Sequence, residues 1–237
     1  YLEEAKSLCQ LDIEFTGALG YRTQYQQNPL SQLLIKIKRI NGNQNLSQEC
    51  HQVDLPKIIS LIDDTLLTKV KFLSLDNQLQ SVKLSPVEQT VILAIIYSKF
   101  RGGASDDELL HEELLSFIDS LISNTTVWLV QYKALLIRSL LEKEKRRKVE
   151  RSMMQLDELV EIVRGLHKNN ANKNQRSEMF FAVLSNPIWI MEKYLADILV
   201  SLGVTKTALE IYLRLQFWDD VITCYQRYVF ISFVNLV

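Results

Sequence analysis

The side chains that could do acid–base or metal chemistry are few and widely separated. Three histidines occur in the chain, His51, His111 and His167. His111-Glu-Glu lacks the second histidine of the H-E-x-x-H zinc motif. Cys50 precedes His51, but adjacent residues on a helix point about 100° apart, so the two would not face each other there. We expect the histidines to be surface or helix-capping residues rather than general bases.

Two adjacent acids, Asp63 and Asp64, could bind a metal ion. No histidine, cysteine or third carboxylate occurs at ligand spacing nearby. We therefore expect one of them to cap a helix N-terminus. No G-x-S-x-G or phosphate-loop pattern is present. The sequence predicts no catalytic residue, no metal site and no cofactor, although a site can be assembled from distant residues.

Gly17 and Gly20 stand close together, just before Arg22. The pattern G-x-x-x-x-G-K-[ST] is absent, and no strand is predicted before the glycines, so a phosphate loop is disfavoured. We interpret this stretch as a tightly packed helix–helix corner in which Arg22 anchors a carbonyl or a carboxylate.

The most charged run extends from Glu142 to Arg151 and contains four consecutive basic residues, 145–148. Such a cluster could contact RNA or an acidic partner. It has no interleaved aromatic residues and is flanked by glutamates, so a solvated bend between two helices is favoured. The formal net charge of −1 gives no global attraction to nucleic acid or to an anionic membrane.

Composition favours long helices. The 237 residues include 7 Gly and 4 Pro against 47% hydrophobic residues, which disfavours a turn-rich β fold. Cys9, Cys50 and Cys224 form no C-x-x-C pair, which is typical of reduced intracellular thiols. No signal peptide and no apolar run of roughly 20 residues is seen, so no membrane span is expected. The chain opens at Tyr1, which suggests a piece of a longer protein.

The N-terminal third is predicted to be helical with loops. Helical spacing of apolar residues predicts a helix over residues 1–20. A second helix is predicted from Asn28-Pro29, with a short strand through 34–38 as an open alternative. A short helix is expected over 55–62, and a loop with possible short strands over 68–84.

The middle of the chain is predicted to be an antiparallel helical array. Ser85-Pro-Val-Glu88 is a capping box, and Gly102-Gly103 ends the helix that it starts. Ser105 to Glu108 is a second capping box. A third helix is expected near Trp128, and another through residues 154–163. Residues 167–176 are the predicted boundary loop, and 180–184 a short apolar helix.

A tetratricopeptide-like pattern follows near the C-terminal end. Its form is L-A-x2-L-x3-G-x4-A-x3-Y, followed by W-x2-V-I-x2-Y. The residues that carry it are Leu195, Ala196, Leu199, Gly203, Ala208, Tyr212, Trp218, Val221 and Tyr225. Any helical hairpin places Ala and Leu at such intervals, but two successive units match here.

Each signature residue has an expected structural role. Ala196 and Ala208 would lie where two helices cross, and Gly203 would supply a left-handed residue after the first helix. Tyr212, Trp218 and Tyr225 would fill the gap to the next helix. The second unit follows the first after fewer residues than the roughly 34 of a regular repeat. Either the second helix is truncated or the second match is partial.

The chain resembles the tetratricopeptide repeat protein 27 family of eukaryotes over about residues 1–227. The resemblance is carried by residues 15–23, 63–67, 148–153 and 202–212, and by 218–221 with 224–225. It implies a nucleo-cytoplasmic interaction protein that helps to assemble ribonucleoprotein complexes, including a spliceosomal GTPase, together with chaperones. The chain departs from the family at its end. Val229 and Val234 stand where a glycine and a small residue are expected, so residues 228–237 are interpreted as a truncated or misread terminus.

These observations predict an all-α protein, an α-solenoid with tetratricopeptide-like repeats at its C-terminal end. The expected divisions are 1–84, 85–168 and 177–237. The predicted function is a non-enzymatic protein–protein interaction scaffold; a purely structural segment and an enzyme remain as alternatives. Expected partners are other proteins, with no membrane, direct nucleic-acid or small-molecule partner. The expected location is the cytoplasm, with the nucleus as a second site. Lys206, Arg214 and Arg227 lie on repeat helices, but no register assigns them to a partner, so the partner-binding residues stay unknown.

Overall fold

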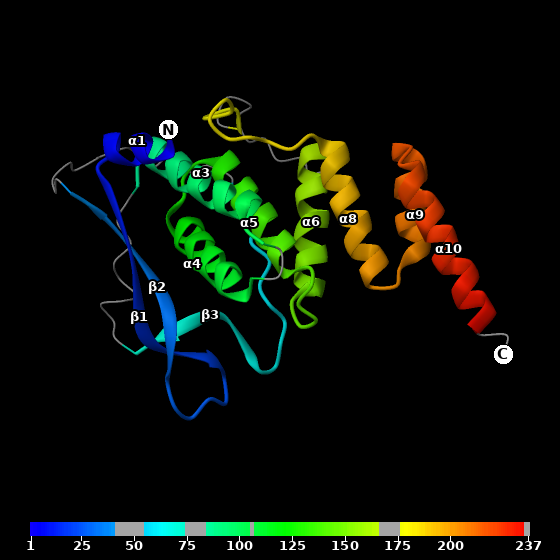
Figure 1. Cartoon of the computed structure of the whole chain (residues 1–237), viewed down its shortest axis with the longest axis horizontal. Coiled ribbons are helices and arrows are strands. Elements are labelled where there is room, and N and C mark those ends of the chain that lie inside the picture. The colour runs from blue at the N-terminus through cyan, green and yellow to red at the C-terminus, as the bar shows by residue number, and fades with distance from the viewer. Residues whose placement is uncertain (41–54, 74–83, 105–106, 166–175, 235–237) are drawn as a thin grey trace.

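A row of helices with a small sheet at one end makes up the molecule (Figure 1). The computed structural model describes residues 1–40, 55–73, 84–104, 107–165 and 176–234, without the side chains of 228–234. The strands are β1 (Leu11–Thr23), β2 (Leu30–Arg39) and β3 (Leu66–Phe72). The helices are α1 (Leu2–Leu8), α3 (Pro86–Gly102), α4 (Glu108–Asn124), α5 (Trp128–Glu142), α6 (Val149–Arg164), α8 (Ile188–Ser201), α9 (Thr205–Leu215) and α10 (Trp218–Val234).

The N-terminal region is not all helical, so the all-α prediction is wrong there. β1 is the central strand of an antiparallel sheet of order β2-β1-β3. The predicted helix over 1–20 ends at Leu8, and the predicted helix after Pro29 is instead β2, the alternative left open. The physical reason is alternation with period two, because Ile35 and Ile37 are both buried on the face of β2 that packs against α4.

Gly20 allows β1 and β3 to approach closely, so the predicted helix–helix corner is wrong. A Cβ atom at this position would lie 2.9 Å from Val70 Cγ1 and 3.0 Å from the Lys71 carbonyl oxygen. The expectation for Arg22 is confirmed, since its guanidinium pairs with the Glu112 carboxylate on α4.

Residues 55–62 form no regular helix, contrary to prediction. The side chain of Gln155 on α6 makes hydrogen bonds to two of their backbone groups. It accepts from the Ile59 amide at 2.9 Å and donates to the Lys57 carbonyl at 2.9 Å. Asp63 does not cap a helix. Its carboxylate accepts from the amides of Thr65 and Leu66, each at 2.7 Å, in the turn that leads into β3. These hydrogen bonds lower the pKa of Asp63 to about 2.

The predicted helices of the middle region are confirmed. Ser85 and Glu88 form the capping box of α3, and Gly103 follows its last residue. The second helix is capped differently from the prediction. Asp107 accepts hydrogen bonds from the amides of Leu109 and Leu110, while Ser105 lies outside the described residues. α5 is buried along nearly its whole length because α3, α4 and α6 pack around it.

The charged run between α5 and α6 is only partly the solvated bend that was predicted. Arg146 and Arg147 are exposed, but Glu142 and Arg151 at the two ends of the run are buried. Their side chains pair with each other, which offsets the desolvation of both charges. Glu142 and Arg151 are nine positions apart, and nothing in the sequence indicated that the two helices would bring their side chains together.

The C-terminal helices continue the row, with α6 against α8, α8 against α9, and α9 against α10 (Figure 1). Residues 177–182 form turns rather than the predicted short helix, and most of the predicted boundary loop lies outside the described residues. One cluster of buried apolar side chains extends from Leu11 in β1 to Cys224 in α10. The division into three regions stays a prediction.

Candidate functional site

The two alanines of the repeat signature are completely buried. Ala196 on α8 and Ala208 on α9 each have 0% exposure, and the two helices pack against each other. Small side chains at such positions let two helix backbones approach. Gly203 follows α8 with φ of +82°, a left-handed conformation that glycine adopts at little cost. These residues therefore set the geometry of the α8–α9 hairpin.

The larger signature residues of this hairpin fill its interior. Leu195 and Leu199 are buried on α8, and Tyr212 is buried on α9. The Tyr212 hydroxyl donates a hydrogen bond to the Asp197 carboxylate at 2.6 Å. Burial and this hydrogen bond both raise the pKa of Tyr212 well above its usual range. The phenol therefore acts as a neutral hydrogen-bond donor that ties α9 to α8.

α10 has one buried and one exposed face. Val221 and Cys224 are buried, whereas Trp218 and Tyr225 are 59% and 51% exposed. Ile222 is also exposed and lies between them in the sequence. The expectation that Trp218 and Tyr225 fill the gap to a following helix is not met within the described residues. They give the end of the helical row an apolar, aromatic surface.

Ion pairs link α8 to its neighbours α6, α9 and α10. Glu192 on α8 is buried and accepts from Arg164 of α6 at 2.8 Å and from Arg214 of α9 at 3.0 Å. Lys193 on α8 pairs with Asp220 on α10 at 2.7 Å. Arg214 is thus committed to a structural pair.

Lys206 on α9 and Arg227 on α10 are exposed. Arg214 pairs with Glu192, and the sequence did not reveal this pairing.

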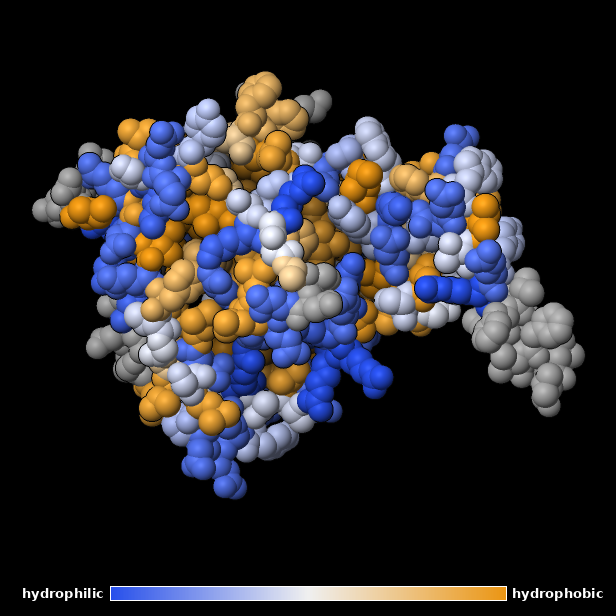
Figure 2. Space-filling model, viewed as in Figure 1, coloured by the Kyte–Doolittle hydropathy of each residue, from blue (hydrophilic) through white to orange (hydrophobic). Residues whose placement is uncertain are grey.

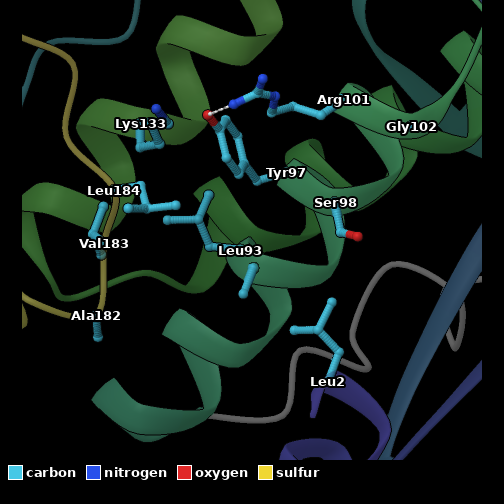
Figure 3. Close-up of a pocket in the computed structure, with 11 residues that line it drawn as sticks. Leu2, Leu93, Tyr97, Ser98, Arg101, Gly102, Lys133, Ala182, Val183 and Leu184 are labelled. Atoms are coloured by element: carbon cyan, nitrogen blue, oxygen red, sulfur yellow. Dashed lines mark hydrogen bonds between the residues drawn. The ribbon is translucent and has the colours of Figure 1, made fainter.

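A cavity of about 530 Å³ lies apart from the repeat helices, between α3, α5 and residues 182–184 (Figure 3). Its walls are mostly apolar and include Leu2, Leu93, Val183 and Leu184. Volume and lining suit an apolar side chain or a small apolar molecule. No pattern in the sequence indicated this cavity, because its walls come from separate segments.

Lys133 is the buried cation of this cavity. Its ammonium lies 4.5 Å from the centre of the Tyr97 ring and donates a hydrogen bond to Asn186 Oδ1. Burial, with a smaller effect of Arg101, lowers the pKa of Lys133 to about 8. The described lining residues include no carboxylate, imidazole or thiol, so they contain no pair for acid–base hydrolysis.

The structure describes only some of the residues first considered for chemistry. His51, His167 and Cys50 lie outside the described residues, and His111 is half-buried on α4. Burial raises the pKa of both the Cys9 and Cys224 thiols. In the part of the chain that the structure describes, no three His, Cys, Asp or Glu side chains are grouped to hold a metal ion. No helix there has the length and apolarity needed to cross a bilayer.

Comparison with known proteins relates the chain to tetratricopeptide repeat proteins. A TPR repeat-containing protein of Schizosaccharomyces pombe is 29% identical over 94% of this chain and 33% of its own length. Tetratricopeptide repeat-containing protein trd-1 of Caenorhabditis elegans is 30% identical over 95% of this chain and 29% of its own length. Tetratricopeptide repeat protein 27 homolog of Dictyostelium discoideum is 26% identical over 94% of this chain and 26% of its own length.

The predicted resemblance is thereby confirmed, since curated homologues over about 95% of the chain are tetratricopeptide repeat proteins that include a protein 27 homolog. The chain spans about a third or less of the length of these relatives. No family model matches the chain, and no solved structure matches it.

Proposed function

We propose that this chain is a non-enzymatic scaffold segment for protein–protein interaction within a tetratricopeptide repeat protein. The observation that carries the proposal is the continuous row of helices α6, α8, α9 and α10, together with relatives that are repeat proteins. Stacked helix pairs of this kind form extended surfaces that bind other proteins. The signature residues Ala196, Gly203 and Ala208 would then have structural roles, holding the helices that present the surface.

The finer proposal is that the parent protein is a co-chaperone or assembly factor for ribonucleoprotein complexes, including one with a spliceosomal GTPase. Its support is the resemblance to the tetratricopeptide repeat protein 27 family. Chaperones and ribonucleoprotein factors would be the partners, in the cytoplasm and the nucleus. Membrane, direct nucleic-acid and small-molecule partners are not part of this proposal.

The test is affinity capture from a cell lysate with the whole chain as bait. Ala208→Arg is the disrupted variant, because a long charged side chain does not fit a fully buried contact between α8 and α9. Lys206→Arg, on the exposed face of the same helix, is the matched control. We expect the wild type and Lys206→Arg to retain the same chaperones or ribonucleoprotein factors and Ala208→Arg to lose them. Equal retention by all three baits would show that the α8–α9 hairpin is not the recognition surface, and no retention at all would indicate a structural segment without binding activity of its own.

A second pair of variants locates the surface. Trp218 on α10 and Trp189 on α8 are exposed to a similar extent. Loss of the captured proteins with Trp218→Ser but not with Trp189→Ser would place the contact at the aromatic end of the helical row. The opposite result would place the contact at the start of α8, where Trp189 lies.

A further inference from the structure

A charged cleft lies where the sheet meets the helices, and the proposed scaffold role does not use it. It has a volume of about 260 Å³ and is bounded by β3, α4 and the α5–α6 connection. Figure 2 shows strongly hydrophilic side chains at the lower centre of the view, in the region of the α5–α6 connection of Figure 1. Its described cationic lining residues are Arg22, Lys69, Lys145, Lys148 and Arg151.

The acids of the cleft are outnumbered by these cations. The described carboxylates that line it are Glu112, Asp119 and Glu142. Glu112 and Glu142 each lie close to two of the cations. Glu112 pairs with Arg22 and lies 3.3 Å from Lys145 Nζ.

Glu142 serves a second set of cations deeper in the cleft. It accepts from Arg151 Nε at 3.0 Å and lies 3.9 Å from Lys148 Nζ. Arg138 lies beside this group and donates to Gln155 Oε1 at 3.1 Å. Because two of the three acids each face two cations, the half-buried cleft has an excess of positive charge and a positive potential.

Burial and the neighbouring charges together shift the pKa values of two residues of the cleft. Burial lowers the pKa of Lys148, and the neighbouring cations Arg151, Lys145 and Arg22 lower it further against the effect of Glu142. Burial raises the pKa of Asp119, although Arg138 and Lys69 oppose the rise. Burial, the largest cause of both shifts, disfavours an unpaired charge of either sign in the cleft, whereas the contributions of the neighbouring cations reflect its positive charge.

We infer that this cleft binds a terminal phosphate group, held chiefly by Lys145 and Lys148 with Arg22 at the rim. Arginine and lysine form short, charge-assisted hydrogen bonds to phosphate oxygens. A terminal phosphate carries close to two negative charges near neutral pH, which matches the excess of cations.

A terminal phosphate fits better than the backbone of a nucleic acid. A phosphodiester has one charge and continues in two directions, whereas a phosphate at the end of a ligand enters from one side. The cleft is also smaller than the pockets of roughly 300–1,000 Å³ that enclose whole small molecules. The group can belong to a free phosphate ion or to a phosphorylated side chain of a protein.

The test measures binding to the whole chain at pH 7.5 by isothermal titration calorimetry. The probes are inorganic phosphate, pyrophosphate, a phosphoserine peptide with its unphosphorylated form, and a single-stranded RNA without a terminal phosphate. Lys148→Gln and Lys145→Gln remove the proposed contacts. Lys143→Gln removes the same charge from the same connection, but Lys143 lines a different pocket. Asp119→Asn removes a carboxylate that would repel phosphate.

We expect at least one phosphate probe to bind the wild type. Each of the two contact variants should weaken binding about tenfold or more, because a hydrogen bond to a charged group contributes roughly 1.5–3 kcal/mol. Lys143→Gln should bind like the wild type, and Asp119→Asn should bind more tightly. Binding of the phosphopeptide in preference to inorganic phosphate would identify a protein as the source of the group.

The inference is overturned if no phosphate probe binds, or if Lys143→Gln weakens binding as much as Lys148→Gln. Tighter binding of single-stranded RNA than of any terminal phosphate would also overturn it. None of these results depends on the capture experiment, so the scaffold proposal and the phosphate site can fail separately.

Discussion

Arg151 at the start of α6 and Glu142 at the end of α5 form a two-point ion pair, and their side chains are only 6% and 2% exposed. This pair links α5 to α6 on the buried side of the hairpin, whereas Arg146 and Arg147 of the connection are exposed. A buried charge without its partner is strongly destabilising, although the intact pair adds little net stability.

Arg151→Met should therefore lower the free energy of unfolding by about 3–5 kcal/mol, because it leaves Glu142 buried without its bidentate partner. Arg146→Met, which removes an exposed guanidinium from the same connection, should change it by about 0.5 kcal/mol or less. Urea denaturation followed by circular dichroism measures both. Equal effects of the two variants would show that the ion pair is not formed.

Ala208→Arg should destabilise the α8–α9–α10 end by about 3 kcal/mol or more, because the side chain would enter a fully packed contact and bury a charge. Limited proteolysis should show early cleavage in α9 and α10, with α3 to α5 still protected. Lys206→Arg should leave the cleavage pattern of the wild type unchanged. Uniform cleavage throughout the Ala208→Arg chain would mean that the C-terminal helices do not unfold separately.

Gly203→Ala should lower the free energy of unfolding by about 1–2 kcal/mol. Its φ of +82° is left-handed, and a Cβ atom there would meet no other atom within 4 Å, so the effect comes from the backbone alone. Gly102→Ala is the matched control, since it is equally open but lacks the positive φ. That variant should stabilise the protein by about 0.4–1 kcal/mol. Thermal melting of the two variants tests whether Gly203→Ala lowers the stability and Gly102→Ala raises it.

Lys133 should make stability depend on pH above neutrality. Its pKa is about 8 in the folded protein and ordinarily 10.5. Between these values the unfolded chain binds a proton that the folded chain has lost, so stability rises with pH. Below pH 8 both states are protonated, and the folded state carries the full cost of burying the charge.

Lys133→Met should remove this dependence. Relative to the variant, the free energy of unfolding of the wild type should rise by about 3 kcal/mol from pH 8 to 10.5. Urea denaturation at a series of pH values gives the difference. Parallel pH profiles for the two proteins would show that Lys133 is not buried as a cation.

The helical half of the fold could be predicted because its signals are local. Ser85 and Glu88 stand at capping-box spacing, and the apolar residues from Leu114 to Ile122 repeat at helical intervals, so α3 and α4 followed from neighbouring residues alone. Strands over 34–38 and within 68–84 were predicted only as alternatives, because a short apolar stretch such as Leu33–Ile37 fits a helix or a strand until a partner strand is present.

The sequence by itself determined the helical row and its tetratricopeptide-like end, since Ala196, Gly203 and Ala208 encode a hairpin within a few turns of chain. Only the tertiary structure decided the sheet, the Arg151–Glu142 pair, the cavity around Lys133 and the charged cleft. Each of these depends on residues that are distant in sequence or on separate elements, and the energy of a charge depends on what surrounds it after folding. A linear pattern shows which residues are charged or apolar, but packing determines which of them meet and how far water is excluded.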